Sequence, residues 1–493
     1  MTTLRLATGF LLLFCAAAMA QPFTKISDQI VSNDGGDSRS VNWVDIDGDG
    51  DLDLFVTNGH SPGTNNFAYE NLGNGVFDKI TNSAIVQDSA RSDGASWGDV
   101  DNDGDPDVFV ANWYNDQNLF YINEGDWQFR RIAEGPPGGS MGFSESCSWA
   151  DANNDGWLDL FIANSGNRQP ERNAFYLATD GTSFTKIFDS PLSADAAASR
   201  SPNWADVDGD GDADMFVANE GDSPNHFFKN LLKENGKLAF EKITDGAIAK
   251  DAENSISGSW ADVDNDGDFD LFVANLGQPN VLYLNDGRGN FQRQNAFSDS
   301  SRSFGSSWGD IDNDGDLDLF VANGWAKTGL NNQLFRNLLA ETGTATFEEI
   351  SGDPVVQDGG WSYGSSFADY DSDGDLDLFV AKWLNSKDEN NALFRNDLAN
   401  ENNWLIVNCV GTTSNRSAIG ATVRVKAKIN GKSVWQMRQI SGQDSYCGQN
   451  LQLHFGLGNA QSVDSLIVNW PSGVTQTVAI SAINRSTTIS EHR

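Results

Sequence analysis

One pattern of polar and hydrophobic positions recurs seven times along this chain. Its first copy runs from Trp43 to Val56, where aspartates alternate first with glycine and then with leucine, phenylalanine and valine. An aromatic residue stands two positions ahead of each first aspartate, tryptophan in six copies and Phe367 in the seventh. Such self-similarity predicts a repeat architecture. The first aspartates are Asp45, Asp99, Asp151, Asp206, Asp262, Asp310 and Asp369.

Each repeat contains four short segments with the patterning expected of β-strands. The first ends at the aromatic residue, and the second is a run such as Asp-Leu-Phe-Val-Ala-Asn. The third is an aromatic run flanked by asparagines, as in 118–123, and the fourth is a Phe-x-x-Ile segment, as in 347–350. Ala178 replaces the closing asparagine in the third repeat, and the fourth segment of the fifth repeat, Phe291–Gln294, is irregular. The helical period is missing, so four strands per repeat predict a propeller blade.

The two ends of the array predict a closed ring. The seventh repeat has no Phe-x-x-Ile segment after Asn396, whereas such a segment, Phe23–Ile26, stands alone near the N-terminus. We expect it to pair with the strand around 391–396 and to supply the missing outer strand of the seventh blade. This pairing removes an open sheet edge.

After Asn400 the repeats stop and the pattern changes. Alternation in 421–427 predicts a half-buried strand, and scattered glycines mark turns. The sequence therefore predicts an all-β protein: a seven-bladed β-propeller over residues 21–400, followed by a small C-terminal β domain over 401–493.

The first twenty residues have the pattern of a secretory signal peptide. Arg5 precedes an apolar run that ends at Ala18, and small residues follow up to Ala20. The run is shorter than the ~20 residues that span a bilayer. We expect cleavage after Ala20, a secreted, extracellular or periplasmic location, and no membrane insertion.

The net charge limits the classes of partner that this protein can bind. The chain has 70 Asp and Glu against 32 Lys and Arg, a formal net charge of −38. Binding to nucleic acid or to an anionic membrane surface needs clusters of basic residues, so both partners are excluded. The 39% of hydrophobic residues is enough for a packed core, which excludes global disorder.

The aspartates have the spacing of a calcium loop. Side-chain oxygens recur at positions 1, 3, 5 and 9, glycine stands at position 6, and the carbonyl of position 7 is available. Crowded carboxylates repel one another without a cation, and Ca²⁺ accepts six to eight oxygen ligands in flexible geometry. The first nine positions match an EF-hand loop, but position 12 is valine or isoleucine, never glutamate. We therefore expect calcium loops within β-hairpins, with up to seven Ca²⁺ ions.

The third loop is the weakest, because Trp157 replaces the usual aspartate at position 7. The expected metal positions are Asp45, Asp47, Asp49, Asp51 and Asp53; Asp99, Asp101, Asp103, Asp105 and Asp107; Asp151, Asn153, Asp155, Trp157 and Asp159; Asp206, Asp208, Asp210, Asp212 and Asp214; Asp262, Asp264, Asp266, Asp268 and Asp270; Asp310, Asp312, Asp314, Asp316 and Asp318; Asp369, Asp371, Asp373, Asp375 and Asp377.

These repeats resemble the FG-GAP/VCBS repeats of the integrin α-chain propeller over roughly residues 21–400. The motifs at 414–421, 453–458 and 468–473 resemble the ASPIC/UnbV domain, and the whole chain is similar to the cartilage acidic protein family. The resemblance implies a secreted calcium-binding protein and names no reaction. It also implies that the calcium loops join the first and second strands on one face, and that ligands usually bind the opposite face.

Candidate ligand contacts follow the second strands of their blades: His60, Trp113, Tyr114, Trp325 and Trp383. Exposed aromatic residues on the face opposite the loops would stack on sugar rings or anchor a protein. The alternative is that they pack between blades.

Three functions remain open. The first is a rigid binding or adhesion scaffold, a monomeric propeller with an extracellular protein or glycan ligand. The second is an exported carbohydrate-active enzyme, a lyase or hydrolase, and the third is an assembly partner of another exported protein. Nucleophile-elbow, Walker and Rossmann motifs are missing, and His454 is interpreted as structural.

Three cysteines remain after the predicted cleavage. Cys409 and Cys447 lie in the small β domain of an exported chain, so we expect them to form a disulfide. Cys147 would then be the odd, buried thiol.

Overall fold

The computed structural model describes residues 22–59, 61–325, 331–383, 389–398 and 401–492. The predicted signal peptide and His60 lie outside the described residues. In the part that is described, no helix is long and apolar enough to cross a membrane.

Seven sheets of the described chain repeat one plan, and we call each of them a blade. From the innermost strand outward, the first contains β2 (Ser38–Val44), β3 (Asp53–Asn58), β4 (Phe67–Asn71) and β5 (Phe77–Lys79). The second contains β6 (Ser92–Gly98), β7 (Asp107–Asn112), β9 (Leu119–Asn123) and β10 (Phe129–Arg131). The third contains β12 (Ser144–Ala150), β13 (Asp159–Asn164), β15 (Ala174–Ala178) and β16 (Phe184–Ile187).

The remaining blades follow the same order. The fourth contains β18 (Ser199–Ala205), β19 (Asp214–Asn219), β20 (His226–Asn230) and β21 (Phe240–Ile243). The fifth contains β22 (Ser255–Ala261), β23 (Asp270–Asn275), β24 (Val281–Asn285) and β25 (Phe291–Gln294). The sixth contains β26 (Ser303–Gly309), β27 (Asp318–Asn323), β28 (Gln333–Asn337) and β29 (Phe347–Glu349). The seventh contains β30 (Ser362–Ala368), β31 (Asp377–Lys382), β32 (Ala392–Asn396) and β1 (Phe23–Ile26).

Short elements decorate the blades. Two pairs of two-residue strands join neighbouring repeats: β8 (Asp116–Gln117) with β11 (Met141–Gly142), and β14 (Glu171–Arg172) with β17 (Ala196–Ala197). The helical turns are η1 (Ile30–Ser32), η2 (Ala84–Val86), α1 (Pro191–Ala194), α2 (Leu232–Asn235), α3 (Ala247–Lys250), α4 (Leu339–Thr342) and α5 (Pro354–Gln357).

The blades form a closed circle. The innermost strand of each blade lies against that of the next, and β30 lies against β2. Both faces of a blade are therefore covered, and every residue of the second strands, such as β3, is buried. At the junction of the first and seventh blades, the rings of Trp43 and Tyr370 stack with centroids 6.2 Å apart. The all-β class predicted from the sequence is confirmed.

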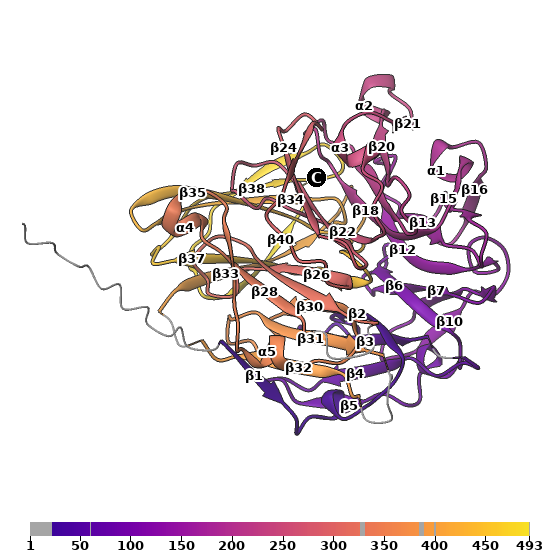
Figure 1. Cartoon of the computed structure of the whole chain (residues 1–493), viewed down its shortest axis with the longest axis horizontal. Coiled ribbons are helices and arrows are strands. Elements are labelled where there is room, and N and C mark those ends of the chain that lie inside the picture. The colour runs from indigo at the N-terminus through magenta and orange to yellow at the C-terminus, as the bar shows by residue number, and fades with distance from the viewer. Residues whose placement is uncertain (1–21, 60, 326–330, 384–388, 399–400, 493) are drawn as a thin grey trace, which may run out of the picture.

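The N-terminal strand completes the seventh blade. β1 pairs antiparallel with β32, and Phe23 lies opposite Asn396 in the register. In Figure 1 the indigo β1 lies beside the orange β32. Phe23 is 2% exposed and stacks on Phe367 with ring centroids 6.5 Å apart. The segment expected to pair with 391–396 does so.

The C-terminal part contains two further sheets. One consists of β33 (Asn403–Val410), β37 (Leu453–Gly458) and β40 (Ser486–Ser490). The other consists of β34 (Thr422–Ile429), β35 (Lys432–Gln439), β38 (Val463–Asn469) and β39 (Thr475–Val478). Their inner faces share one apolar core, in which Val423, Phe455 and Leu466 are fully buried.

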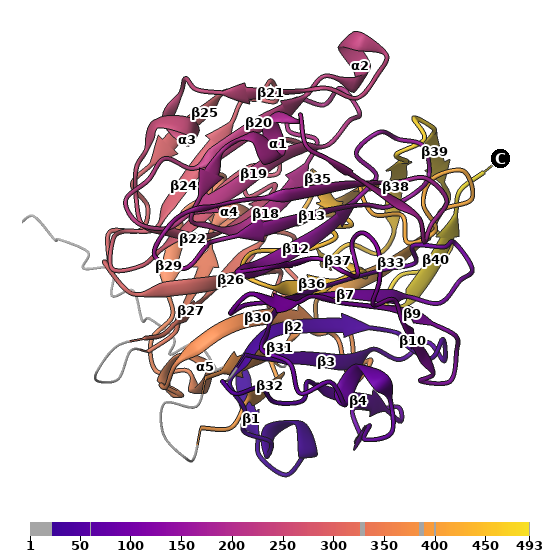
Figure 2. The same cartoon turned by 90° about the vertical axis from the view of Figure 1, so that its right-hand side faces the viewer.

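One segment of this domain enters the propeller axis, and we call residues 441–450 the axial segment. Its strand β36 (Gly448–Asn450) pairs in parallel with β2, and Figure 2 shows β36 close to β2 and β30. Ser445 Oγ bonds to Ser257 Oγ at 3.1 Å, and it accepts the amide of Ser306 at 2.6 Å. The hydroxyl of Tyr446 bonds to acids of the second and third blades. The boundary expected at residue 400 is therefore crossed by a later segment that touches the blades from within.

The predicted disulfide between Cys409 and Cys447 is wrong, because both thiols are free. Cys409 is buried in β33, in the core of the C-terminal domain, whereas Cys447 lies in the axial segment. Because the axial segment lies outside the core of the C-terminal domain, Cys447 and Cys409 belong to different apolar clusters. Cys147 is buried and free as well.

Removing the ring of Phe23 is predicted to weaken the closure of the circle. Phe23→Ala should lower the free energy of unfolding by about 3 kcal/mol, because it empties a packed aromatic site. The control is Lys25→Ala in the same strand. Its side chain is 41% exposed and pairs with Asp358, so its loss should cost less than about 1 kcal/mol. Denaturant unfolding in saturating calcium measures both, and equal stabilities would contradict this role of β1.

Candidate metal centres and the opposite face

The aspartate-rich loops join the innermost strand of each blade to the second strand. The first loop turns at Gly50, whose φ of +100° favours glycine. The amide of Gly50 donates to the carboxylate of Asp45 at 3.2 Å. The same bond, from position 6 to position 1, recurs in five further loops. The first aspartate thus fixes the turn.

The aspartate at position 9 joins three parts of its blade. Oδ1 of Asp53 accepts the amide of Asn71 at 2.8 Å, and Oδ2 accepts the amide of Ile46 at 2.9 Å. Burial raises the pKa of Asp53 to about 8, although the two amide bonds act in the opposite direction. The same two bonds form at Asp107, Asp159, Asp214, Asp270, Asp318 and Asp377.

The closing asparagine of the third strand clasps adjacent blades together. Nδ2 of Asn123 donates to the carbonyl of Ile46 in the preceding blade at 3.0 Å. Ala178 occupies this position in the third blade and has no side-chain amide, although its backbone amide donates to Asp159. The junction of the second and third blades therefore lacks the bond. Equivalent clasps come from Asn71, Asn230, Asn285, Asn337 and Asn396.

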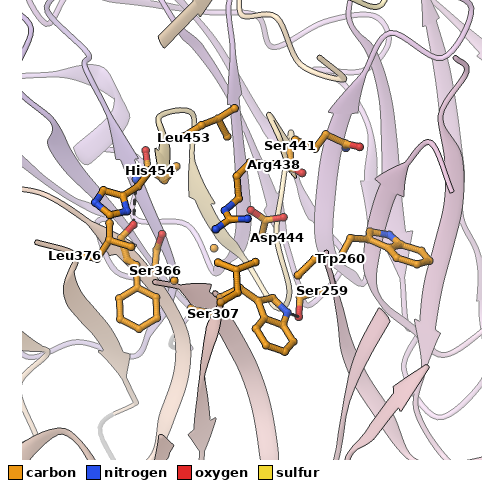
Figure 3. A pocket seen from close by; sticks show the side chains of 18 of the residues that line it. Ser259, Trp260, Ser307, Ser366, Leu376, Arg438, Ser441, Asp444, Leu453 and His454 are labelled. Atoms are coloured by element: carbon orange, nitrogen blue, oxygen red, sulfur yellow. Dashed lines mark hydrogen bonds between the residues drawn. The ribbon is translucent and has the colours of Figure 1, made fainter. Parts of the chain in front are cut away.

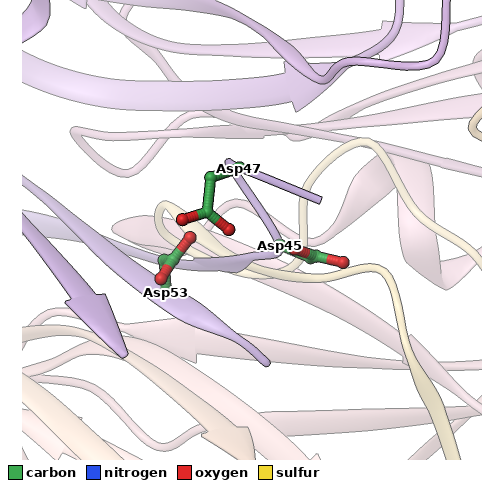
Figure 4. A group of neighbouring side chains, drawn as sticks. All are labelled: Asp45, Asp47 and Asp53. Carbon is green, nitrogen blue, oxygen red and sulfur yellow. The ribbon is translucent and has the colours of Figure 1, made fainter. Parts of the chain in front are cut away.

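Carboxylates predicted as metal ligands converge in the loops. In the first loop one oxygen each of Asp45, Asp47 and Asp53 lie within 4.8 Å of one another. Figure 4 shows the carboxylates of Asp47 and Asp53 facing each other. Positions 1, 3 and 9 also meet in the second loop, and positions 1, 3 and 5 meet in the fourth and fifth. Burial raises the pKa of Asp99, the first residue of the second loop, to about 7.

Buried oxygens test whether a cation fits. Oδ1 of Asp45 is buried without a hydrogen-bond partner, and so is Oδ1 of the position 3 aspartates Asp101, Asp208, Asp264 and Asp371. A buried carboxylate oxygen without a donor is costly unless a cation approaches it. The set consists of hard oxygen donors, which is the chemistry that Ca²⁺ prefers. The acidic clusters are therefore compatible with calcium.

The third loop keeps the side-chain oxygens that are expected to bind a metal ion. Nδ2 of Asn153 donates to Asp155 at 2.9 Å, and the amide of Trp157 donates to the same carboxylate at 3.0 Å. The Trp157 ring reaches Gly181, on the hairpin beyond the third strand of the same blade. The side chain at position 7 thus packs, and its backbone follows the other loops.

Charged residues near the loops were missed by the sequence reasoning. Glu70 precedes the clasp Asn71, and its pKa is raised by burial and by Asp47 and Asp49. At the same position in the sixth blade, Arg336 Nε lies 2.9 Å from Asp312. In the fourth blade Lys229 pairs with Asp208 and with Glu234 of α2. The sequence feature that could have identified them is a charged residue directly before the closing asparagine of the third strand.

The C-terminal domain covers the loop face. Ser417 Oγ accepts the amide of Asp99 at 2.8 Å, and the amide of Gly458 donates to Asn313 at 2.7 Å. His454 Nε2 lies 3.0 Å from the carbonyl of Gly374 in the seventh loop. Burial lowers the pKa of His454 to about 4, so the ring is neutral near pH 7. The predicted structural role of His454 is thus a contact between domain and loop.

The four candidate ligand residues that the structure describes lie on the opposite face, in two groups. Trp113 contacts Tyr114 with centroids 4.3 Å apart, and Arg91 lies 4.5 Å from the Tyr114 ring. In the second group, Trp325 and Trp383 are linked through the rings of Phe304 and Tyr363. Tyr114 is 40% exposed and Trp325 is 43% exposed. The structure thus brings Trp325 and Trp383 together and leaves Trp113 and Tyr114 as a separate pair.

Charged side chains that are buried (the two acids) or partly buried (the two arginines) form the floor between these groups. Each comes from the second residue of an innermost strand: Arg39, Asp93, Glu145 and Arg200. Arg200 pairs with Glu145 at 2.5 Å, and Arg39 lies 3.6 Å from Asp93. Tyr446 of the axial segment bonds to both acids, at 3.2 and 3.3 Å. The sequence signal was a charged residue after the first serine of each of these strands.

Chelation is predicted to make stability fall as the pH rises from about 4 to about 8. Carboxyls such as Asp53 and Asp99 have folded pKa values of about 8 and 7, above the ordinary 3.8. Their contribution is complete below the unfolded pKa and is lost as the pH passes the folded pKa. Calcium requires the ionised form, so it should abolish or reverse the slope. Urea unfolding across this range measures both, and a chelated protein that gains stability would contradict the account.

Comparisons with known proteins divide the chain into the same two parts, the repeats and the C-terminal domain. The model of the FG-GAP-like repeat matches residues 45–110, 99–162, 151–217, 206–273 and 262–321, and the ASPIC and UnbV model matches 411–493. Cartilage acidic protein 1 of Mus musculus is 26% identical over 94% of this chain and 76% of its own length. The Homo sapiens protein is 26% identical over 94% and 75%.

Solved structures with a similar course include YCF48 bound to D1 peptide, with a TM-score of 0.47 and 11% identity over 76% of this chain and 95% of that one. An Agrocybe aegerita lectin that recognises non-reducing terminal N-acetylglucosamine has a TM-score of 0.42 and 15% identity, over 71% and 85%. The repeat matches together cover residues 45–321, more than half of the sequence. The chain belongs to the FG-GAP-like repeat family and carries an ASPIC and UnbV domain at its C-terminus.

Proposed function

We propose that this protein is an exported, calcium-stabilised propeller that binds a protein or glycan on the face opposite its metal loops. The likeness to Cartilage acidic protein 1, whose name places it in cartilage, supports an extracellular setting. The apolar N-terminal segment supports export, to the outside of the cell or to the periplasm.

The seven loops would each hold one Ca²⁺. Side chains at positions 1, 3, 5 and 9 and the carbonyl of position 7 would supply the oxygens. The buried, unpartnered oxygens at position 3 support this assignment. Each occupied loop would stabilise the fold by about 1.4 kcal/mol at a calcium concentration of tenfold Kd. Calcium in this proposal acts as structure and takes part in no reaction.

The observation that carries the ligand face is the cluster around Trp325 and Trp383. Arg39 lies 4.2 Å from the Tyr363 ring and 5.1 Å from the Trp383 ring, and Arg302 lies 5.7 Å from Trp325. Trp325 keeps 43% of its surface exposed. Rigid aromatic rings with arginine beside them are typical of binding hot spots.

The enzyme alternative has weaker support. Asp93 and Glu145 are the acids nearest the axis on this face, and they are buried and engaged with Arg39, Arg200 and Tyr446. Such paired groups hold the floor in place and leave little capacity for proton transfer. A binding scaffold therefore accounts for this face better than a lyase or hydrolase does.

Trp325→Ala is predicted to remove ligand binding without loss of fold. Mature protein would be screened on a glycan array and in pull-downs, in calcium and in chelator, and the hits measured for each variant. The matched control is Phe188→Ala, since Phe188 is 74% exposed and follows the outer strand β16. We expect at least about tenfold weaker binding for Trp325→Ala and none of this loss for Phe188→Ala. Equal loss in both variants, or in neither, would refute the proposed face.

A further inference from the structure

A cavity lies between the propeller and the C-terminal domain, away from the proposed ligand face. Its volume is about 130 Å³. The innermost strands β22, β26 and β30 line one side, and residues 437–439 and 452–454 of the C-terminal domain line the other. Figure 3 shows the side chains that surround it. Nothing in the proposed function uses this space.

Arg438 is the cationic group of this cavity. Its guanidinium points toward the centre (Figure 3). It donates to the carbonyl of Met437 at 2.9 Å and to Oε1 of Gln436 at 3.2 Å, both neutral acceptors. Among the described residues, no carboxylate oxygen lies within the 4.0 Å of an ion pair with it. The side chain is partly buried, and its guanidinium lies 5.3 Å from the centre of the Phe455 ring. A guanidinium shielded from water without a paired anion is costly.

The aspartates that act on its pKa belong to the fifth and sixth loops. Burial lowers the pKa of Arg438, and Asp310, Asp262 and Asp316 act in the opposite direction. These three aspartates are predicted ligands of the fifth and sixth loops. One Ca²⁺ would offset two of the five carboxylate charges of each loop, so calcium would weaken the compensation of Arg438. This step rests on the proposed calcium loading of those loops.

The rest of the lining offers hydrogen bonds to an anion. The hydroxyls of Ser307 and Ser365 share one hydrogen bond at 2.7 Å, which leaves one proton free, and the hydroxyl of Ser366 has only a 3.4 Å bond to Gln449. The one further acid of the lining besides Asp310 is Asp444, which is bonded to Ser441. Hydroxyls and a guanidinium are the groups that proteins use to bind carboxylates and other oxyanions.

We propose that this cavity binds a small oxyanion, held by the Arg438 guanidinium and the serine hydroxyls, and that calcium in the fifth and sixth loops strengthens the binding. The cavity has room for about four waters at ~30 Å³ each. The ligand is therefore a single carboxylate, sulfate or phosphate group, and a sugar ring or peptide does not fit. By linkage the anion in turn favours the calcium-loaded state.

The experiment follows the melting temperature of the calcium-loaded full chain against added sulfate and, separately, acetate, with chloride holding the ionic strength constant. A bound anion raises the melting temperature with concentration. Arg438→Met keeps the length of the side chain and removes the charge. It should weaken anion binding about tenfold to 100-fold. Arg485→Met, which changes an exposed arginine of the same domain by the same charge, should behave as wild type.

Two further measurements keep the outcomes distinct. Crystals grown with selenate in place of sulfate should show an anomalous peak beside Arg438 in wild type, which does not depend on any variant folding. The calcium bound per chain is counted in the same samples. An effect of sulfate alone or acetate alone supports the site and identifies its anion. Calcium-loaded protein that responds to neither anion overturns this inference alone, whereas failure to bind calcium overturns the proposed function with it.

Discussion

The carboxylate at position 9 of each loop is the interaction on which the rest of the structure depends. In the first blade, Asp53 holds the start of its own loop and the end of the third strand through two amide bonds. The asparagine placed by the second bond then reaches the neighbouring blade. One buried charge thus sets the loop, the strand and the junction between blades. Its burial is costly, and a cation at the mouth of the loop would offset that cost.

Much of this could be predicted from the sequence, because the repeat brings local patterns into phase. The strands and loops depend on residues that are close together within one repeat. The pairing of Phe23–Ile26 with the last blade follows from the outer strand that the seventh repeat lacks. The role of Asn123 as a clasp was not evident, since its partner Ile46 lies in another repeat. Cys447 was misplaced for the same reason. No repeat pattern in the sequence indicates that residues 441–450 leave the C-terminal domain and lie along the propeller axis.

The C-terminal domain and the loops form one unit. The domain covers the loop face through Ser417, His454 and Gly458, and its axial segment bonds to the innermost strands. Loops occupied by calcium would therefore stabilise both the ring of blades and the attachment of the C-terminal domain to it. On the opposite face, Trp325 is 43% exposed. This division explains how a strongly acidic scaffold can present a rigid aromatic surface.

Hydrogen exchange of the full chain in calcium and in chelator tests this central claim most directly. The account predicts that chelation speeds exchange in the aspartate loops and, together with them, at residues 415–420, 436–440 and 454–458 of the C-terminal domain. Outer strands such as β16 should change least. Faster exchange in the loops alone, with unchanged protection of those C-terminal residues, would contradict the claim that the metal loops carry the domain.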